Sequence, residues 1–195
     1  AKFIFLGVKP QMMKGLLESI AEVLSERTDR FVLVAMAAGI KIEDYSKMLG
    51  AEYPVIRIMP NTPVSIGEGV VLYDASPDVF MDEITDFSNC MRNAGLLDRL
   101  DEGLIDAASA VSGCGPAFVY MFAEALADGA VECGLPRAKA LEYAAQTLLG
   151  SARLLLESGK HPGVLKDEVC SPAGSTIAGV HALERAGLRG AAMDA

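Results

Sequence analysis

Residues 2–10, Lys-Phe-Ile-Phe-Leu-Gly-Val-Lys-Pro, set the pattern for the first half of the chain. Their apolar run is typical of a buried strand, and a Lys-Pro pair ends it. A helix is expected after the strand, because apolar residues then recur at helical spacing: Met13, Leu16, Leu17, Ile20 and Leu24. This stretch therefore predicts a strand–turn–helix unit.

The same pattern returns further along the chain. Apolar runs at 31–35 and 55–59 end in loops of small residues or proline, and a helical pattern covers 42–49. Strands rich in Val, Ile and Phe that alternate with helices predict an α/β, Rossmann-like parallel sheet covered on both faces. The remaining expected elements are a strand at 69–73, a helix over 77–94 and a strand at 96–100.

Three loops are expected at one edge of this sheet. In parallel sheets, ligands lie outside the carboxyl ends of the strands. The segments 7–10, 36–39 and 59–61 each follow such an end. We therefore expect a binding edge, although each loop taken alone also fits plain turn chemistry, since Gly and Pro mark turns everywhere.

The sequence changes character near residue 101, after which only helical patterns recur. We therefore expect two domains: residues 1–100 belong to the α/β domain and residues 101–195 form an all-helical one. The helix expected over 118–131 is apolar nearly all round, and so small a domain cannot enclose it. A second copy of the chain is the simplest cover, which predicts an obligate homodimer.

Composition narrows the function classes. The net charge is −9 with both signs interspersed, so no basic surface for nucleic acid or anionic lipid is expected. The four cysteines form no C-x-x-C pair and there are two histidines, which argues against a metal site or a disulfide framework and favours the cytoplasm. The longest uncharged run, 107–123, is shorter than a membrane span and contains Gly and Pro, so no transmembrane helix is expected.

Residues 169–184, Val-Cys-Ser-Pro-Ala-Gly-Ser-Thr-Ile-Ala-Gly-Val-His-Ala-Leu-Glu, carry the strongest functional pattern. A Ser-Pro turn leads into a helix start, where the N–H groups of Gly174, Ser175 and Thr176 are expected to be free for a carboxylate or phosphate. Hydroxyl groups in the same stretch, that of Ser171 included, add hydrogen-bond donors. Ser and Thr are also favoured N-cap residues, so ordinary capping explains the same pattern.

Six motifs, in order and spacing, closely resemble those of the pyrroline-5-carboxylate reductase family. The resemblance covers essentially the whole chain. It implies a dinucleotide-binding domain followed by a helical dimerisation domain, and reduction of 1-pyrroline-5-carboxylate to L-proline with NADPH or NADH, the last step of proline biosynthesis. The motifs are Val8-Lys9-Pro10, Ala37-Ala38-Gly39, Met59-Pro60-Asn61-Thr62-Pro63, Ser112-Gly113-Cys114-Gly115-Pro116-Ala117, Gly134-Leu135-Pro136-Arg137 and Ser171-Pro172-Ala173-Gly174-Ser175-Thr176.

The resemblance also implies site residues. Thr176 is the catalytic candidate, with its hydroxyl at the substrate nitrogen or carboxylate. Glu102 is implied as a substrate contact, although a solvated charge in the acidic turn 98–102 is an equally good interpretation. The full implied sets are Glu102, Ser171, Gly174, Ser175 and Thr176 for the substrate, and Gly7, Val8, Lys9, Pro10, Met36, Ala37, Ala38, Pro60 and Asn61 for the cofactor.

Three features depart from the family pattern. Glu168 stands where members often have an amide that touches the dinucleotide, and Ala173 replaces a common glycine. No G-x-G-x-x-G opens the chain, so we expect that about two βα units precede Ala1 and that the chain as given binds dinucleotide poorly.

Two other functions stay open. A related hydroxy-acid dehydrogenase would share the domain plan but place a lysine at the domain junction, and no lysine lies between Lys47 and Lys139. A non-catalytic dimerisation fragment would be consistent with the missing glycine fingerprint.

Overall fold

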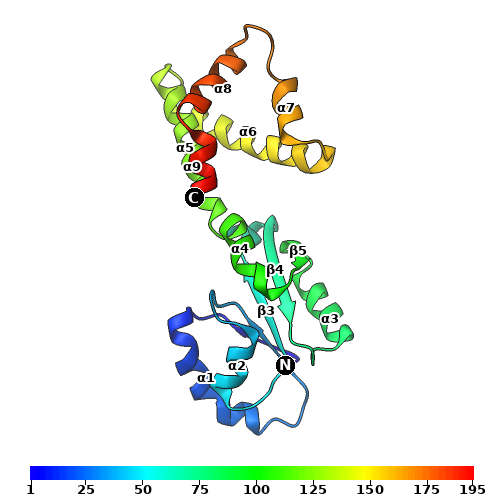
Figure 1. The fold of residues 1–195 in the computed structure, drawn as a ribbon. Helices are drawn as coiled ribbons and strands as arrows, with labels where there is room; N and C mark the ends of the chain where they lie inside the picture. The colour runs from blue at the N-terminus through cyan, green and yellow to red at the C-terminus, as the bar shows by residue number, and fades with distance from the viewer. The chain divides into compact units, whose positions relative to one another are not determined.

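The computed structural model describes residues 1–195 and divides into two compact units, Ala1–Met121 and Phe122–Ala195. The expected domain boundary after residue 100 stays a prediction. The first unit contains β1 (Phe3–Leu6), α1 (Pro10–Ser25), β2 (Val32–Ala35), α2 (Ile42–Leu49), β3 (Val55–Pro60), the 3-10 helix η1 (Thr62–Ile66), β4 (Gly69–Ala75), α3 (Met81–Met91), β5 (Gly95–Arg99) and α4 (Glu102–Ser112) (Figure 1). Helix α5 (Gly115–Glu132) begins in the first unit and ends in the second, which continues with α6 (Arg137–Ser158), α7 (Pro162–Glu168), α8 (Ser175–Arg185) and α9 (Leu188–Asp194).

The five strands form one sheet in the order β1-β2-β3-β4-β5. The pairs β1–β2, β2–β3 and β4–β5 are parallel, whereas β3–β4 is antiparallel. The predicted α/β fold followed by helices is confirmed, but the expectation of a wholly parallel sheet is wrong at one pair. Only residues 61–68 connect β3 to β4, and a parallel return needs a crossover of about a dozen residues or more.

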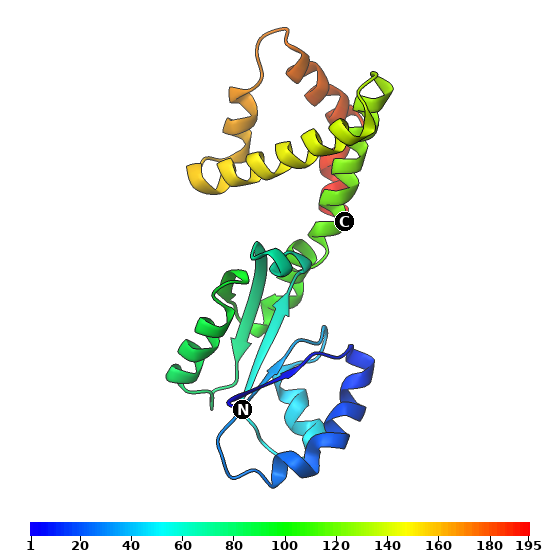
Figure 2. The ribbon, with the colours of Figure 1, turned by 180° about the vertical axis from the view of Figure 1, so that it is seen from behind.

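Helices cover both faces of the sheet, as Figure 2 shows from behind. Side chains of β2 alternate between the faces: Leu33 packs with α1 and α2, while Val32 and Val34 pack with α3. All residues of β2 are buried, because this strand lies inside the sheet and between two layers of helices. The first unit thus has two well-filled cores, one on each face.

A buried carboxylate, that of Glu83 on α3, holds this helix to the loop before β2. Glu83 accepts hydrogen bonds from Nε and Nη2 of Arg30 at 2.8 and 2.9 Å, and from the N–H of Phe80 at 2.8 Å. These hydrogen bonds favour the charged form, so the pKa of Glu83 lies below its ordinary value. The side chain of Glu83 is 3% exposed and that of Arg30 is 41% exposed, so a half-buried ion pair ties α3 to the loop before β2.

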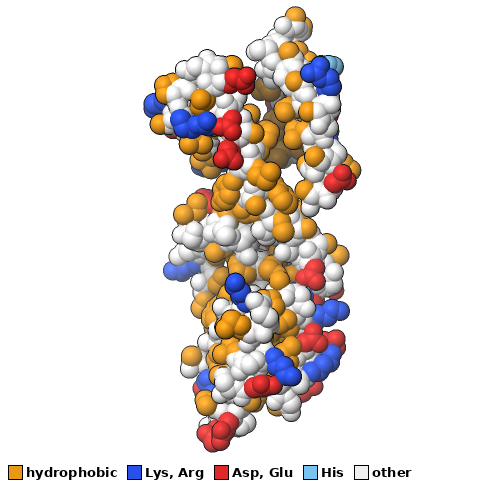
Figure 3. All heavy atoms as spheres, turned by 90° about the vertical axis from the view of Figure 1, so that its left-hand side faces the viewer, with side chains coloured by type: hydrophobic (Ala, Val, Ile, Leu, Met, Phe, Trp, Pro, Cys, Tyr) orange, Lys and Arg blue, Asp and Glu red, His pale blue; other side chains and the backbone are white.

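The second unit has a much smaller core. Its fully or nearly buried residues are Ala127, Ala140 and Ala144, where α5 crosses α6 at close range. Large apolar side chains on the same helices stay exposed: Leu126 is 41% and Leu156 is 84% exposed. Figure 3 shows hydrophobic side chains gathered over the helical part, including the hollow that its helices enclose.

The stretch Glu102–Glu132, which comprises α4 and α5 with a break at residues 113–114, is long and apolar enough to cross a membrane, judged by length and composition alone. The expectation that the chain has no transmembrane helix stays a prediction. A helix buried by a partner in a soluble protein has the same composition. Within this chain, 6% of its most apolar window is buried.

Candidate functional site

Three loops leave the sheet at the same edge. The register pairs Leu6 of β1 with Ala35 of β2, and Ala35 with Arg57 of β3, and all three strands run in parallel. The segments that follow these strand ends therefore emerge side by side. They contain every residue implied in cofactor binding, and we call them the rim: Gly7–Pro10, Met36–Ala38 and Pro60–Asn61. Their binding role stays a prediction.

The first two rim loops approach closely. The N–H of Met36 donates to the Leu6 carbonyl at 3.4 Å, and a Cβ on Gly7 would stand 3.7 Å from the sulfur of Met36. Ala37 is 1% exposed and belongs to the core, so a ligand would meet its backbone rather than its side chain. Lys9 is exposed and is the one charged side chain of the rim, which makes it the natural partner of a phosphate.

Residues Ser171–Gly174 form a tight turn in front of α8. The N–H of Gly174 donates to the Ser171 carbonyl at 3.0 Å, and Pro172 stands at the second position. Ala173 stands at the third, with a φ of 56°, and no other non-glycine residue has a positive φ. This combination is typical of a type II turn, which favours glycine at its third position. The turn therefore holds an alanine where the backbone prefers glycine.

The helix start offers fewer backbone donors than expected. The prediction that the Gly174 N–H is free is wrong, because the turn uses it. The N–H groups of Ser175 and Thr176, in the first turn of α8, have no backbone partner. The N-cap is Gly174, and no side chain caps the helix, so ordinary Ser/Thr capping does not account for this sequence. Ser171, Ser175 and Thr176 are all exposed and open to a ligand.

The segment before this turn is held by short polar contacts. His161 accepts a hydrogen bond from the Gly163 N–H through Nδ1 at 3.1 Å and so caps α7, a helix that sequence reasoning missed. Lys160 and Glu168 form an ion pair at 2.6 Å. A hydrogen bond to Asp167 raises the pKa of Lys166. The charge of Glu168 is therefore balanced within the chain.

The comparisons with known proteins agree with each other. A family model described as pyrroline-5-carboxylate reductase dimerisation matches residues 102–195. Pyrroline-5-carboxylate reductase 3 of Danio rerio is 46% identical over 195 residues, which cover 100% of this chain and 67% of that protein. The pyrroline-5-carboxylate reductase of Escherichia coli K12 is 40% identical over 195 residues, covering 100% and 71%.

This chain belongs to the pyrroline-5-carboxylate reductase family. A solved structure agrees: that of Plasmodium falciparum pyrroline carboxylate reductase with NADP bound superposes with a TM-score of 0.91 at 31% identity. It matches 100% of this chain and 72% of its own chain.

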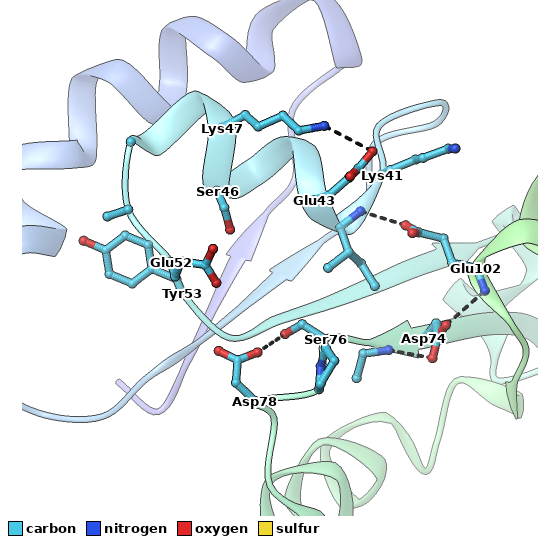
Figure 4. Close-up of a pocket in the computed structure, with 15 residues that line it drawn as sticks. Lys41, Glu43, Ser46, Lys47, Glu52, Tyr53, Asp74, Ser76, Asp78 and Glu102 are labelled. Atoms are coloured by element: carbon cyan, nitrogen blue, oxygen red, sulfur yellow. Dashed lines mark hydrogen bonds and ion pairs between the residues drawn. The ribbon is translucent and has the colours of Figure 1, made fainter.

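Glu102, the family-implied substrate contact, lies in the first unit and is already engaged. Its Oε1 accepts from the Ile42 N–H at 2.7 Å and from Nη1 of Arg57 at 3.3 Å, and its own N–H donates to Asp74 at 2.9 Å. Figure 4 shows the carboxylate directed at the first turn of α2. With 22% of its side chain exposed, Glu102 is not a freely solvated charge. Its role toward substrate stays a prediction.

Figure 4 also shows a pocket of about 960 Å³, which lies between α2, the end of β4 and Glu102. No rim residue lines it. Two of its acidic residues have partners: Glu43 pairs with Lys47, and Asp78 accepts a hydrogen bond from Ser76. This pocket is separate from the loops that the family resemblance points to.

Sequence reasoning missed Arg57. This residue is 1% exposed inside the apolar strand Val55–Pro60, and its Nη2 donates to Asp106 at 2.7 Å while Nη1 donates to Glu102. A charged residue in an otherwise apolar buried strand was the available signal, because buried charges must be paired. Arg57 holds the beginning of α4 against β3.

No group of three or more His, Cys, Asp or Glu side chains is placed to hold a metal ion. All four cysteines are free thiols.

Proposed function

We propose that this chain reduces the C=N bond of 1-pyrroline-5-carboxylate to give L-proline, with a hydride from NADPH or NADH. The observation that carries the proposal is 40–46% identity to named pyrroline-5-carboxylate reductases along the entire chain. The Plasmodium falciparum relative was solved with NADP bound, which supports the choice of cofactor.

The reaction defines what the chain must supply. A hydride from the dihydronicotinamide goes to the imine carbon, a proton goes to the ring nitrogen, and the oxidised dinucleotide leaves with proline. No protein nucleophile is needed, so the site must anchor the carboxylate, orient the ring and provide a hydrogen-bond partner for the nitrogen. Exposed hydroxyls and free N–H groups are suited to these tasks.

We assign the substrate to the start of α8. The N–H groups of Ser175 and Thr176 bind the substrate carboxylate, aided by the helix dipole and the Ser171 hydroxyl. Gly174 serves through its backbone geometry: a Cβ there would stand 3.1 Å from the Ser171 carbonyl, tighter than most real contacts. The Thr176 hydroxyl bonds the substrate nitrogen or carboxylate.

We assign the dinucleotide to the rim. Its loops present backbone groups from the implied residues Gly7, Val8, Pro10, Met36, Ala37, Ala38 and Pro60. Lys9 supplies the positive charge for a phosphate. This assignment follows the family resemblance and the common edge that these loops share.

We further propose that two copies of the chain form a homodimer in the cytoplasm. The exposed apolar surface of α5 and α6 needs a cover, and the matching family model is described as a dimerisation domain. The four free thiols fit a reducing compartment.

Replacing Thr176 by alanine tests the function. In the gene product we expect kcat/KM for 1-pyrroline-5-carboxylate to fall about 10- to 150-fold, because a hydrogen bond to a charged ligand contributes about 1.5–3 kcal/mol. NADPH affinity stays the same. Thr85→Ala is the control, since Thr85 is exposed on α3 and bonds only the Met81 carbonyl. An unchanged kcat/KM for Thr176→Ala would refute the assignment.

A further inference from the structure

Asn61 lies on the rim, directly after β3, and both ends of its amide are occupied. Its Oδ1 accepts from the Val70 N–H at 2.9 Å, and its Nδ2 donates to the Ser112 carbonyl at 2.9 Å. The backbone of Asn61 adds a hydrogen bond to Val70 at 3.2 Å. The amide therefore joins the β3–β4 connection to the last residue of α4, and each end of it is held by a bond within the chain.

The sequence explains why the Ser112 carbonyl needs this donor. In a continuous helix it would accept from the N–H of the residue four positions later, which is Pro116. Proline has no N–H, so this carbonyl loses its helical partner. The Asn61 amide supplies the missing donor.

The other end of α4 is held by the same strand. Arg57 and Asn61 are four residues apart along an extended backbone, so their side chains lie on the same face. Arg57 binds Glu102 and Asp106 in the first two turns of α4, and Asn61 binds Ser112 at its end. Helix α4 is therefore fastened to the rim-forming strand at both ends.

We propose that Asn61 is a positioning residue that docks the proline-broken end of α4 onto the rim, and that its amide does not bind the cofactor. The inference deepens the proposed function, on which its kinetic arm rests. From Ser112 the chain continues into α5, so this joint sets where α5 begins relative to the rim. Loosening the joint displaces the start of α5 from the rim within the first unit, and a displacement of about 1 Å far from the chemistry can cost on the order of 100-fold in rate.

Asn61→Asp tests this in the gene product. The carboxylate still accepts from Val70 but cannot donate to Ser112. We expect faster hydrogen exchange of the amides of residues 113–115 and 117, a kcat lowered on the order of 10-fold or more, and an NADPH Kd that stays the same. Ser65→Ala is the matched control in the same connection, because Ser65 bonds only the nearby Thr62 carbonyl.

Pro116→Ala provides the rescue. It restores an N–H that the Ser112 carbonyl can accept, so in the Asn61→Asp background it should recover exchange protection at residues 113–115 and 117 and part of kcat. Unchanged exchange in Asn61→Asp, or a raised NADPH Kd that Pro116→Ala does not correct, would overturn the inference. If the unmutated protein shows no turnover, the proposed function fails, while the exchange measurement still decides the role of Asn61. Should Asn61→Asp not fold, Asn61→Ser serves in the same comparison.

Discussion

The first unit, here called the sheet unit, and the second, the helical unit, bury their apolar side chains to different extents. The first fills both faces of its sheet with large side chains such as Leu33 and Phe87, both 0% exposed. The second buries little more than Ala127, Ala140 and Ala144 and leaves its leucines outside. At about 25 cal/mol per Å² of buried apolar area, the three alanines contribute little to stability. We therefore expect the helical unit to need an outside partner more than the sheet unit does.

Disrupting the exposed apolar surface of α5, where a second copy is expected to bind, should give the largest effect on assembly. Leu126→Glu places a charge on α5 where a second copy is expected to cover it, and an unpaired buried charge costs several kcal/mol. We expect the dimer to dissociate in sedimentation velocity. Leu96→Glu is the control, because Leu96 is 62% exposed on β5 of the sheet unit. A stable Leu126→Glu dimer would place the interface elsewhere.

Ala127 is not suited to this experiment. The sequence pattern indicates a dimer surface on the helix around it, but Ala127 is fully buried against α6 within its own chain. A charge there would disrupt the α5–α6 crossing first. The comparison of neighbouring positions 126 and 127 thus separates contacts within the chain from contacts with a second copy.

The sheet unit should lose stability in acid through Glu83. Its folded-state pKa is below the ordinary value, so the stabilisation is present above the unfolded pKa and is lost as the pH falls through the folded pKa. We expect Glu83→Gln to lower the free energy of unfolding by about 1.5–3 kcal/mol at pH 7. The free energy of unfolding, measured by denaturant titration at several pH values, should then fall less steeply in acid than in the wild type. Exposed Glu68→Gln is the control. An equally steep fall in wild type and Glu83→Gln would contradict this.

The turn Ser171–Gly174 should show a smaller change in stability when it is mutated. A left-handed backbone costs an alanine about 1–2 kcal/mol, while glycine costs about 0.4–1 kcal/mol more than alanine in lost chain entropy. Ala173→Gly should therefore stabilise the turn by about 0.5–1 kcal/mol, seen as slower hydrogen exchange at 171–176. Ala178→Gly, inside α8, should do the opposite. Faster exchange in Ala173→Gly would mean that the turn is not strained.

Local sequence patterns predicted most elements of the fold, because the apolar runs at 31–35 and 55–59 and the helical spacing at 42–49 report directly on burial. They did not predict the direction of β4, which depends on the length of the 61–68 connection rather than on the strands themselves. The helix Pro162–Glu168 was missed because seven residues are too few for a clear period.

The candidate site also contains some features that the sequence could predict and others that it could not. The free donors of Ser175 and Thr176 follow from local helix geometry, so sequence reasoning could find them. The loss of the Gly174 N–H depends on how the turn closes, and the bonds of Glu102 and Asn61 join residues distant in sequence. Such pairings become visible only when the chain is folded.

Hydrogen exchange at two protein concentrations tests the difference between the two units most directly. We predict that dilution below the dimer dissociation constant removes protection from the amides of α5 beyond Met121 and of α6, while β2 and β3 keep theirs. Protection of these helices that is the same in monomer and dimer would contradict the dependence of the helical unit on a second copy.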